Sequence, residues 1–467
     1  MSRTMHRLLV LGTIFVLLLG ALSGFAQNEP VTITWFIGLG TGSQPDQLEA
    51  QQAVVDAFNA SQSDIVLETV VVYNTGAGTA PADALLTMIA SGEAPDIVGP
   101  VGIDGSNAFD GQFLDLQPLI DETGYDLSDF DPAAVEFYRV EGQGLIGLPF
   151  GVYPSFIYFN RDLFDEAGLA YPPQEWGAPY VDAEGNERPW DIDTLTELAM
   201  LLTVDANGND ATSPDFDPTQ IEQWGWYQQW TDWRGQATFF GAGSVVGPDN
   251  TAVIPEHWRE FTHWYYDGIW NKHFIPNASE AASDLLNAGN LTPSNRLAMN
   301  LVHLWYNSSA GTDVNWDIAA LPSYNGTITS KLHVDTFRIL NTTEHPEEAF
   351  TVLTYLIGEG AEPLLQVYGS MPARASLQDA FFAQLDETYT QGVNWQVAID
   401  AQAYPDVPSH ESNMPNFVQA KDRIAAFTTL YQGTEGLDID AELETLRTDL
   451  EAIFAGTYVA PEEEASS

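Results

Sequence analysis

The chain of 467 residues contains no cysteine and only three lysines, Lys272, Lys331 and Lys421. Without cysteine it can form no disulfide, no thiolate metal site and no thioether lipid anchor. Its 15 lysines and arginines stand against 66 aspartates and glutamates, and the formal net charge is −51. Such a composition disfavours nucleic acid as a partner, because it cannot supply basic patches for phosphates. We interpret the acidity as a strongly solvated surface, with attraction of a cationic ligand as the alternative.

The N-terminus has the pattern of a secretory signal. A positively charged start precedes an apolar stretch at 8–22, and small residues at 24–26 form a cleavage site, so we expect cleavage after about Ala26. A retained membrane anchor is the alternative, although Gly12 and Gly20 interrupt an apolar run that is already short for a bilayer. We therefore expect a secreted or periplasmic protein without a lipid anchor.

The rest of the chain is long enough for two ordinary domains, and its pattern predicts an α/β fold. Strand-like runs at 31–37 and 65–73 flank a stretch at 48–58 with helical spacing, which is typical of a mostly parallel sheet. Further elements are a helix at 82–91 stopped by Gly92, a strand at 95–98, a helix opened by Pro346, and a helix with one apolar face over 439–453. Residues 459–467 are predicted to be a disordered tail.

One stretch, LPFGVYPSFIYFNRDLFDEAGL at 148–169, is unusual. Two apolar runs enclose a break at Gly151 and Pro154, and an acidic helix-like segment follows at once. The pattern predicts an extended chain that breaks, continues extended and then turns into a helix, with Tyr153 exposed at the break.

The order of motifs resembles one family over nearly all of the mature chain. The segments include VTITWF, LLTMIASGEAPDIV, FLDLQPLI, the stretch at 148–169, DIAALPSYNG, HPEEAFTVLTYLI and MPAR. In this order they are similar to the extracellular solute-binding proteins of bacterial ABC importers, in the sugar-binding branch that includes maltose-binding proteins. The long loops after Tyr171 depart from the simple family pattern.

The resemblance implies a two-lobed periplasmic-binding-protein fold of type II, with a ligand cleft between the lobes and hinge crossings. The crossings would lie near Gly151, near Asp335 and near Met371. The N-terminal lobe would comprise 27–150 plus about 334–372, and the C-terminal lobe 151–333 plus about 373–458. A monomer of this kind would capture a sugar and deliver it to a membrane permease, without catalytic residues, cofactor or metal.

Tryptophans are the first candidates for a sugar-binding face. The chain has 13, and Trp224, Trp226, Trp230 and Trp233 fall within WGWYQQWTDW. Sugar C–H faces lie on aromatic planes while hydroxyls need hydrogen bonds, so we expect one or two of these four to contact ligand, with Trp230 and Trp233 preferred. Further candidates elsewhere in the chain are Trp305 and Trp395. Ordinary core packing is the alternative for each.

Loops beyond the strand ends supply the polar candidates. The first loop, at 38–46, offers Thr41, Ser43 and Gln44, and lacks the lysine and glycine spacing of a phosphate loop. The second, at 99–107, offers Asp104, either as a grip for paired hydroxyls or as a solvated turn residue. The family resemblance adds Tyr153 and Asp335 at the crossings, and Arg374 could answer a single charge on the ligand.

The sequence contains no motif that indicates an enzyme. A secreted glycoside hydrolase would need two carboxylates across the scissile bond, and 66 acids make any pair uninformative. His257 and His263 are six residues apart without an HExxH motif, which disfavours a zinc enzyme, and no G-x-S-x-G elbow is present. The same fold with a peptide, polyamine or glycerol phosphodiester as cargo remains the main alternative.

Overall fold

A computed structural model describes residues 29–73, 80–140 and 142–459. The predicted signal at 1–26, and all of the predicted tail except Val459, lie outside these residues. Within the described residues, no helix combines the length and apolar character needed to cross a membrane.

The first elements form a β-α-β unit, as the sequence predicts. β1 (Val31–Ile37) and β2 (Ile65–Val71) pair in parallel, and α2 (Leu48–Ser61) connects them while burying Val54, Val55 and Phe58. α3 (Pro81–Ser91) ends at Gly92, whose left-handed φ of 77° suits glycine. β3 (Ile97–Val101) then pairs with β1 on its other side.

The stretch after Leu148 forms one long strand rather than two runs with a break. β6 (Leu148–Asn160) is buried over all 13 residues. It changes partners midway: the part up to Pro154 pairs with β13 (Leu332–Ile339), and the part from Ser155 pairs with β11 (Leu297–His303). The expected break is therefore an exchange of neighbours within a continuous strand.

Gly151 is required in β6 by close packing. A Cβ atom there would lie 2.7 Å from the Ser370 Cβ, because the short β14 (Met371–Pro372) pairs with β6 at this point. At the far end, the Asn160 side chain accepts hydrogen bonds from the backbone N–H groups of Asp162 and Leu163. This cap starts α7 (Arg161–Ala167) directly after the strand, as predicted.

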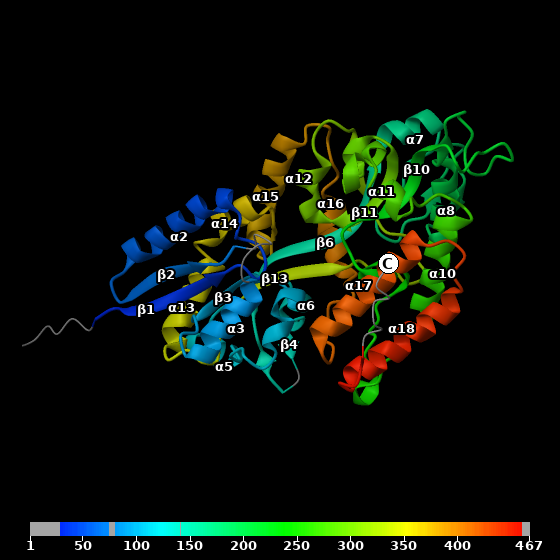
Figure 1. Cartoon of the computed structure of the whole chain (residues 1–467). Coiled ribbons are helices and arrows are strands. Elements are labelled where there is room, and N and C mark those ends of the chain that lie inside the picture. Colours follow the sequence, from blue (N-terminus) through cyan, green and yellow to red (C-terminus); the bar gives the residue numbers. More distant parts are fainter. Residues whose placement is uncertain (1–28, 74–79, 141, 460–467) are drawn as a thin grey trace, which may run out of the picture.

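β6 and β13 join two halves of one ten-stranded mixed sheet, with the order β2-β1-β3-β13-β6-β11-β10-β9 along its main path. Figure 1 shows the two strands side by side between the halves. We call the half with β1–β3, α2 and α3 the N-lobe; it also contains α4 (Ile103–Ser106), α5 (Gln117–Thr123), α13 (Pro346–Leu356) and α14 (Ala361–Tyr368).

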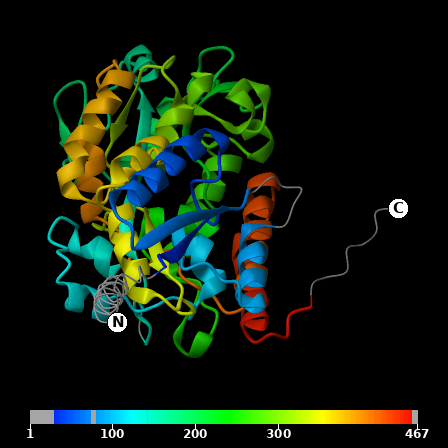
Figure 2. The same cartoon turned by 90° about the vertical axis from the view of Figure 1, so that its left-hand side faces the viewer.

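The other half is the C-lobe. Its sheet contains β9 (Val204–Asp205), β10 (Ile221–Gln228), β11 and β12 (Trp316–Ala319), and its main helices are α7, α8 (Ile192–Leu201), α9 (Trp233–Ala237), α10 (Glu256–Trp270), α17 (Phe417–Gly433) and α18 (Ile439–Phe454). β10 and β11 run parallel, so their carboxyl ends lie at the same edge of the sheet. The predicted apolar face of α18 is buried. In Figure 2, seen from the N-lobe end, α17 and α18 run along one side.

The remaining helices and strands are short except for α15, which has 14 residues. They are α6 (Pro132–Glu136), β4 (Arg139–Val140), β5 (Gly144–Leu145), β7 (Tyr180–Val181), β8 (Glu187–Arg188), α11 (Ala278–Ala281), α12 (Asn307–Ala310), α15 (Ala375–Thr388) and α16 (Gln396–Asp400).

Candidate functional site

A cavity of about 220 Å³ lies where the two lobes meet, and we call it the cleft cavity. Asp104 on α4 reaches it from the N-lobe. The C-lobe and the crossing strand β13 contribute the other lining residues, which are Trp230, Thr231, Asp232, Arg234, His333, His410, Glu411 and Lys421. A ligand in this cavity would contact both lobes at once.

Trp230 is the aromatic wall of the cleft cavity. It follows the carboxyl end of β10, and 50% of its surface is exposed. Its ring stands edge-on to Tyr306, with ring centroids 5.0 Å apart. Its φ of 55° is unusual for a bulky side chain, and such conformations persist only where the surroundings fix them. Trp230 therefore offers an exposed apolar surface to the cavity, and its contact with a ligand stays a prediction.

Asp104 and Lys421 face each other across the lobes, with Nζ and Oδ2 2.5 Å apart. A second link joins the lobes nearby, where the Asn107 side chain donates to the backbone carbonyl of Glu411 at 2.8 Å. Asp104 thus lines the cleft cavity with its carboxylate paired to a lysine, and its contact with a ligand stays a prediction. A ligand hydroxyl could share this carboxylate, since a carboxylate accepts several hydrogen bonds.

His333, His410 and Glu411 form the back wall of the cavity, and Asp406 lies buried behind His410. The His333 Nδ1 lies 3.3 Å from a Glu411 carboxylate oxygen, and the His410 Nδ1 lies 2.6 Å from the buried Asp406. Burial works to raise the pKa of Glu411, but His333 and His410 outweigh it and hold this pKa at about 2. Burial likewise works to lower the pKa of His333, and Glu411 outweighs it, so this pKa is raised.

Two further titratable groups lie at this crossing, Asp335 on β13 and the buried Lys331 directly before it. Burial raises the pKa of Asp335 to about 7, with His333 opposing and Glu411 assisting the shift. Burial lowers the pKa of Lys331 to about 8, against the nearby Asp406 and Asp232. The predicted site residue Asp335 is half-buried at the crossing, close to Gly102 of the N-lobe.

The first N-lobe loop approaches the helix that carries Asp104. A Cβ atom on Gly105 would lie 2.5 Å from the Leu39 carbonyl oxygen, so the loop and α4 are in close contact. Thr41 and Ser43 are half-buried, and Gln44 is exposed at the start of a short 3-10 helix at Pro45–Gln47. Within the described residues these three do not line the cleft cavity.

Two predicted ligand tryptophans are core residues. Trp233 is fully buried, with its indole N–H donating to Thr262 and its ring edge-on to Trp258 and Phe427. Trp395 is 5% exposed, and its indole N–H donates to Asp386. The prediction that Trp233 and Trp395 contact ligand is therefore wrong, because a ring enclosed by core side chains has no face left for a sugar.

The prediction that Arg374 could pair with a charge on the ligand is also wrong. Its guanidinium donates to the Ile357 carbonyl, to Asp129 and to Tyr125, and lies over the Phe130 ring. These contacts hold the chain after the crossing at β14 to neighbouring N-lobe segments, so the group has a structural role rather than a place in the cleft cavity.

Tyr153 and Trp305 lie together behind the cleft. Tyr153 is 4% exposed, its hydroxyl is hydrogen-bonded to Ser370, and its ring is edge-on to Trp305 at 5.2 Å. The expectation that Tyr153 is exposed is therefore wrong, since β6 continues through this position and is covered on both faces. Trp305 is half-buried and stacks on His303 at 4.2 Å.

The sequence did not reveal most of the polar residues of the cleft cavity, which we call the polar wall. No motif marks these residues, and they come from three distant segments of the chain: Asp232 and Arg234, His333, and His410 and Glu411. Lys421 had one available signal, because it is among only three lysines in the chain.

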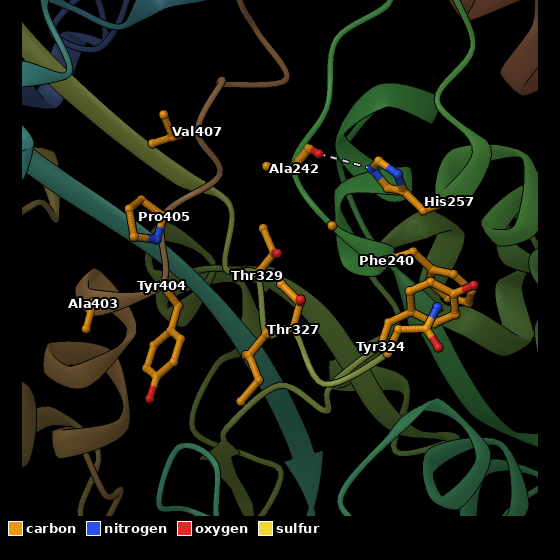
Figure 3. Close-up of a pocket in the computed structure, with 13 residues that line it drawn as sticks. Phe240, Ala242, His257, Tyr324, Thr327, Thr329, Ala403, Tyr404, Pro405 and Val407 are labelled. Carbon is orange, nitrogen blue, oxygen red and sulfur yellow. Dashed lines mark hydrogen bonds between the residues drawn. The ribbon is translucent and has the colours of Figure 1, made fainter.

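A larger cavity of about 570 Å³, the side groove, is built from residues of the C-lobe and its adjoining loops. Figure 3 shows Phe240 beside Tyr324, His257 directed at the Ala242 carbonyl, and Thr327 and Thr329 facing Tyr404 across the space. Phe240 and Tyr324 stack at 4.1 Å. Its uncharged aromatic lining could also contact a sugar, but the residues that line it include none of the N-lobe helices or strands.

Comparisons with known proteins identify the family and the fold. The family described as bacterial extracellular solute-binding protein matches residues 41–363. An uncharacterised lipoprotein of Streptomyces antibioticus is 28% identical over 196 residues, which are 42% of this chain and 39% of that protein, so the match spans less than half of the relative.

Solved structures are similar over most of the chain. UspC of M. tuberculosis has a TM-score of 0.69 at 19% identity, covering 91% of this chain and 100% of that one. The cyclic alpha-maltosyl-1,6-maltose binding protein of Arthrobacter globiformis has a TM-score of 0.65 at 16% identity, with 91% and 100% covered. The sugar-binding protein MalE of Xanthomonas citri has 0.64 at 16% identity, with 91% and 98% covered. The predicted two-lobed α/β fold of type II is confirmed.

Proposed function

The chain belongs to the bacterial extracellular solute-binding proteins, and on this premise we propose that it captures a carbohydrate, an oligosaccharide or a glycoside, for delivery to the permease of an ABC importer. The observation that carries the proposal is Trp230, a half-exposed indole fixed in a cavity that both lobes line.

The chemistry of the cleft cavity suits a sugar. The Trp230 ring offers a plane for the C–H face of a pyranose, and Asp104, Thr231 and Asp232 offer polar atoms for its hydroxyls. The cationic side chains of the cavity, Arg234 and Lys421, are both paired with aspartates, which disfavours a strongly anionic cargo.

The ligands of structural neighbours support the same class. The neighbour from Arthrobacter globiformis is a cyclic alpha-maltosyl-1,6-maltose binding protein, and another neighbour holds mannotriose. For this chain we propose an oligosaccharide or glycoside without committing to its linkage, with a peptide, polyamine or glycerol phosphodiester as alternative cargo.

We also propose that the protein acts as a monomer outside the cytoplasm, released by cleavage after about Ala26 and without a lipid anchor. The proposal rests on the secretory pattern at 1–26 and on the missing cysteine. The matching relative from Streptomyces antibioticus is a lipoprotein. We therefore expect the two proteins to differ in how they are attached to the cell surface. Cell fractionation tests this: recovery in the soluble extracellular or periplasmic material is expected, and recovery mainly in washed membranes would contradict it.

A thermal-shift screen of the purified protein tests the cargo. A ligand at 100 times its dissociation constant stabilises the folded state by about 2.7 kcal/mol. We expect a rise in melting temperature with at least one oligosaccharide or glycoside, and none with polyamines, peptides or glycerol phosphodiesters. A rise confined to one of those other classes would replace the sugar with that cargo.

Binding without catalysis is tested by product analysis. We propose that the protein performs no hydrolysis, so a stabilising oligosaccharide should be recovered intact after long incubation with stoichiometric protein. Cleaved sugar that follows the protein through purification would favour the glycoside hydrolase instead.

A further inference from the structure

We propose that His333, His410 and Glu411, in the back wall of the cleft cavity, form a binding site for one divalent transition-metal ion. Zn²⁺ is the ion that we expect there. The site goes beyond sugar capture and does not depend on it. Two imidazoles and one carboxylate are the ligand set that zinc takes in several proteins that leave a fourth position open.

The spacing of the three side chains suits one ion. Their potential ligand atoms all lie within 4.8 Å of one another, and the His333 Nδ1 is already 3.3 Å from a Glu411 oxygen. Ligand atoms on a tetrahedral zinc ion, with bonds of about 2.0 to 2.2 Å, lie about 3.3 Å apart. One pair thus has the required separation, and the third ligand needs to approach by about 1.5 Å at most.

A second observation concerns how His410 is held. Its Nδ1 lies 2.6 Å from Asp406, which is fully buried and also accepts the backbone N–H of Leu332 and that of His410. A carboxylate that fixes a histidine ring in this way is the usual outer partner of a metal-binding histidine, because it sets the tautomer and raises the basicity of the ring.

The surroundings provide access and a favourable charge. All three residues line the cleft cavity, so an ion can enter without unfolding. The carboxylates of Asp104, Asp232, Asp406 and Glu411 outnumber the cations Lys331, Arg234 and Lys421. Arg234 is already paired with Asp232 at 3.1 Å, and Lys421 with Asp104 at 2.5 Å. A divalent ion would therefore enter a region of net negative charge.

His303, beside His333, has ring nitrogens without hydrogen-bond partners in the part of the chain that the structure describes. It is 1% exposed, its ring centroid lies 4.2 Å from that of His333, and neither ring nitrogen has a hydrogen-bond partner among the described residues. A buried imidazole without partners is costly, and an ion bound at His333 would bring with it waters that could supply one.

The test is calorimetric titration of the chelator-treated, dialysed protein with ZnCl₂. We expect one strong site per chain above a background of weak binding to surface carboxylates. Glu411→Gln and His333→Gln should each weaken the strong site by tenfold or more. Asp440→Asn is the matched control, because it removes the carboxylate of another histidine pair, His263–Asp440 at 3.1 Å, on the exposed surface of α18. This control should leave the strong site unchanged.

A second measurement covers the case in which a variant does not fold. Co²⁺ bound to the wild-type protein should give the intense visible absorption of four-coordinate cobalt, and added Zn²⁺ should remove it. Absence of a strong zinc site in the wild type, absence of the cobalt band, or a strong site that persists in both folded variants would each overturn the proposal. None of these outcomes bears on sugar binding, which is measured separately.

Discussion

Asp104 of the N-lobe and Lys421 of the C-lobe form an ion pair across the cleft, 2.5 Å from Oδ2 to Nζ. Together with the bond from Asn107 to the Glu411 carbonyl, it exists only while the lobes are close. The structure is therefore a closed arrangement of the two halves. Hinge motion in β6, β13 and β14 would separate these partners, as expected for a fold whose crossings absorb domain closure.

The first prediction concerns this ion pair. Lys421→Met should favour the open form, because it removes a contact that only the closed form makes. Both side chains are more than a third exposed, so the ion pair stabilises the closed form by at most about 1 kcal/mol. Sugar affinity should therefore fall about fivefold at most.

Solution scattering of the sugar-free protein should show a larger radius of gyration for Lys421→Met, with the difference shrinking in high salt. Arg447→Met is the control, since Arg447 pairs with Glu444 on α18, within one lobe. Equal radii for the wild type and Lys421→Met would contradict a closing role for the pair.

The second prediction concerns Trp230. Replacing it with alanine should weaken sugar binding by about 2 kcal/mol, about thirtyfold, because the ring is the apolar face that a sugar would cover. The melting temperature of the sugar-free protein should change little, since half of the side chain is exposed. Calorimetry and thermal denaturation measure both. Normal affinity in the variant would move the sugar away from Trp230.

The third prediction concerns Trp233, three residues further on. Its ring is enclosed by Trp258 and Phe427, so Trp233→Ala should cost about 3 to 5 kcal/mol of folding free energy. Urea unfolding followed by circular dichroism measures this. A variant with wild-type stability that no longer binds sugar would restore Trp233 as a ligand residue.

The fourth prediction concerns the hinge glycine. Gly151→Ala would place a methyl group 2.7 Å from the Ser370 Cβ, and Ser370 also holds the Tyr153 hydroxyl. We expect a loss of about 1 to 3 kcal/mol in unfolding free energy. Gly433→Ala is the matched control, since no atom lies within 4 Å of its added Cβ at the end of α17. That change should be neutral or stabilise by up to about 1 kcal/mol. Equal stability of the two variants would show that β6 can shift at Gly151.

The sequence was sufficient for elements whose pattern is local. The β1-α2-β2 unit and the buried face of α18 follow from the period of their apolar residues, and the structure confirms them. The crossings came from the family resemblance instead. The exact division of the chain between the lobes stays a prediction.

The tryptophan cluster shows where local pattern fails. Trp224 and Trp226 lie in β10, which is covered on both faces, so alternation could not separate core from cleft. Trp230 and Trp233 differ because Asp232 caps α9, accepting the N–H groups of Arg234 and Gly235. That helix start directs Trp233 into the core, while Trp230, before the cap, remains at the surface.

The residues of the polar wall could not be predicted from the sequence for a different reason. His333 lies on β13, and His410 and Glu411 follow more than 70 residues later, so only the folded sheet brings them together. The position of Arg374 was predicted wrongly because its partners Asp129 and Tyr125 lie 245 and 249 residues earlier in the chain.

A crystal structure of the protein with a stabilising oligosaccharide tests the central claim most directly. The account predicts sugar density in the cleft cavity, with one ring on the exposed face of Trp230 and hydroxyl contacts to residues of both lobes, including Asp104. Sugar found instead in the side groove, against Tyr324 and Tyr404 and touching the C-lobe alone, would contradict it.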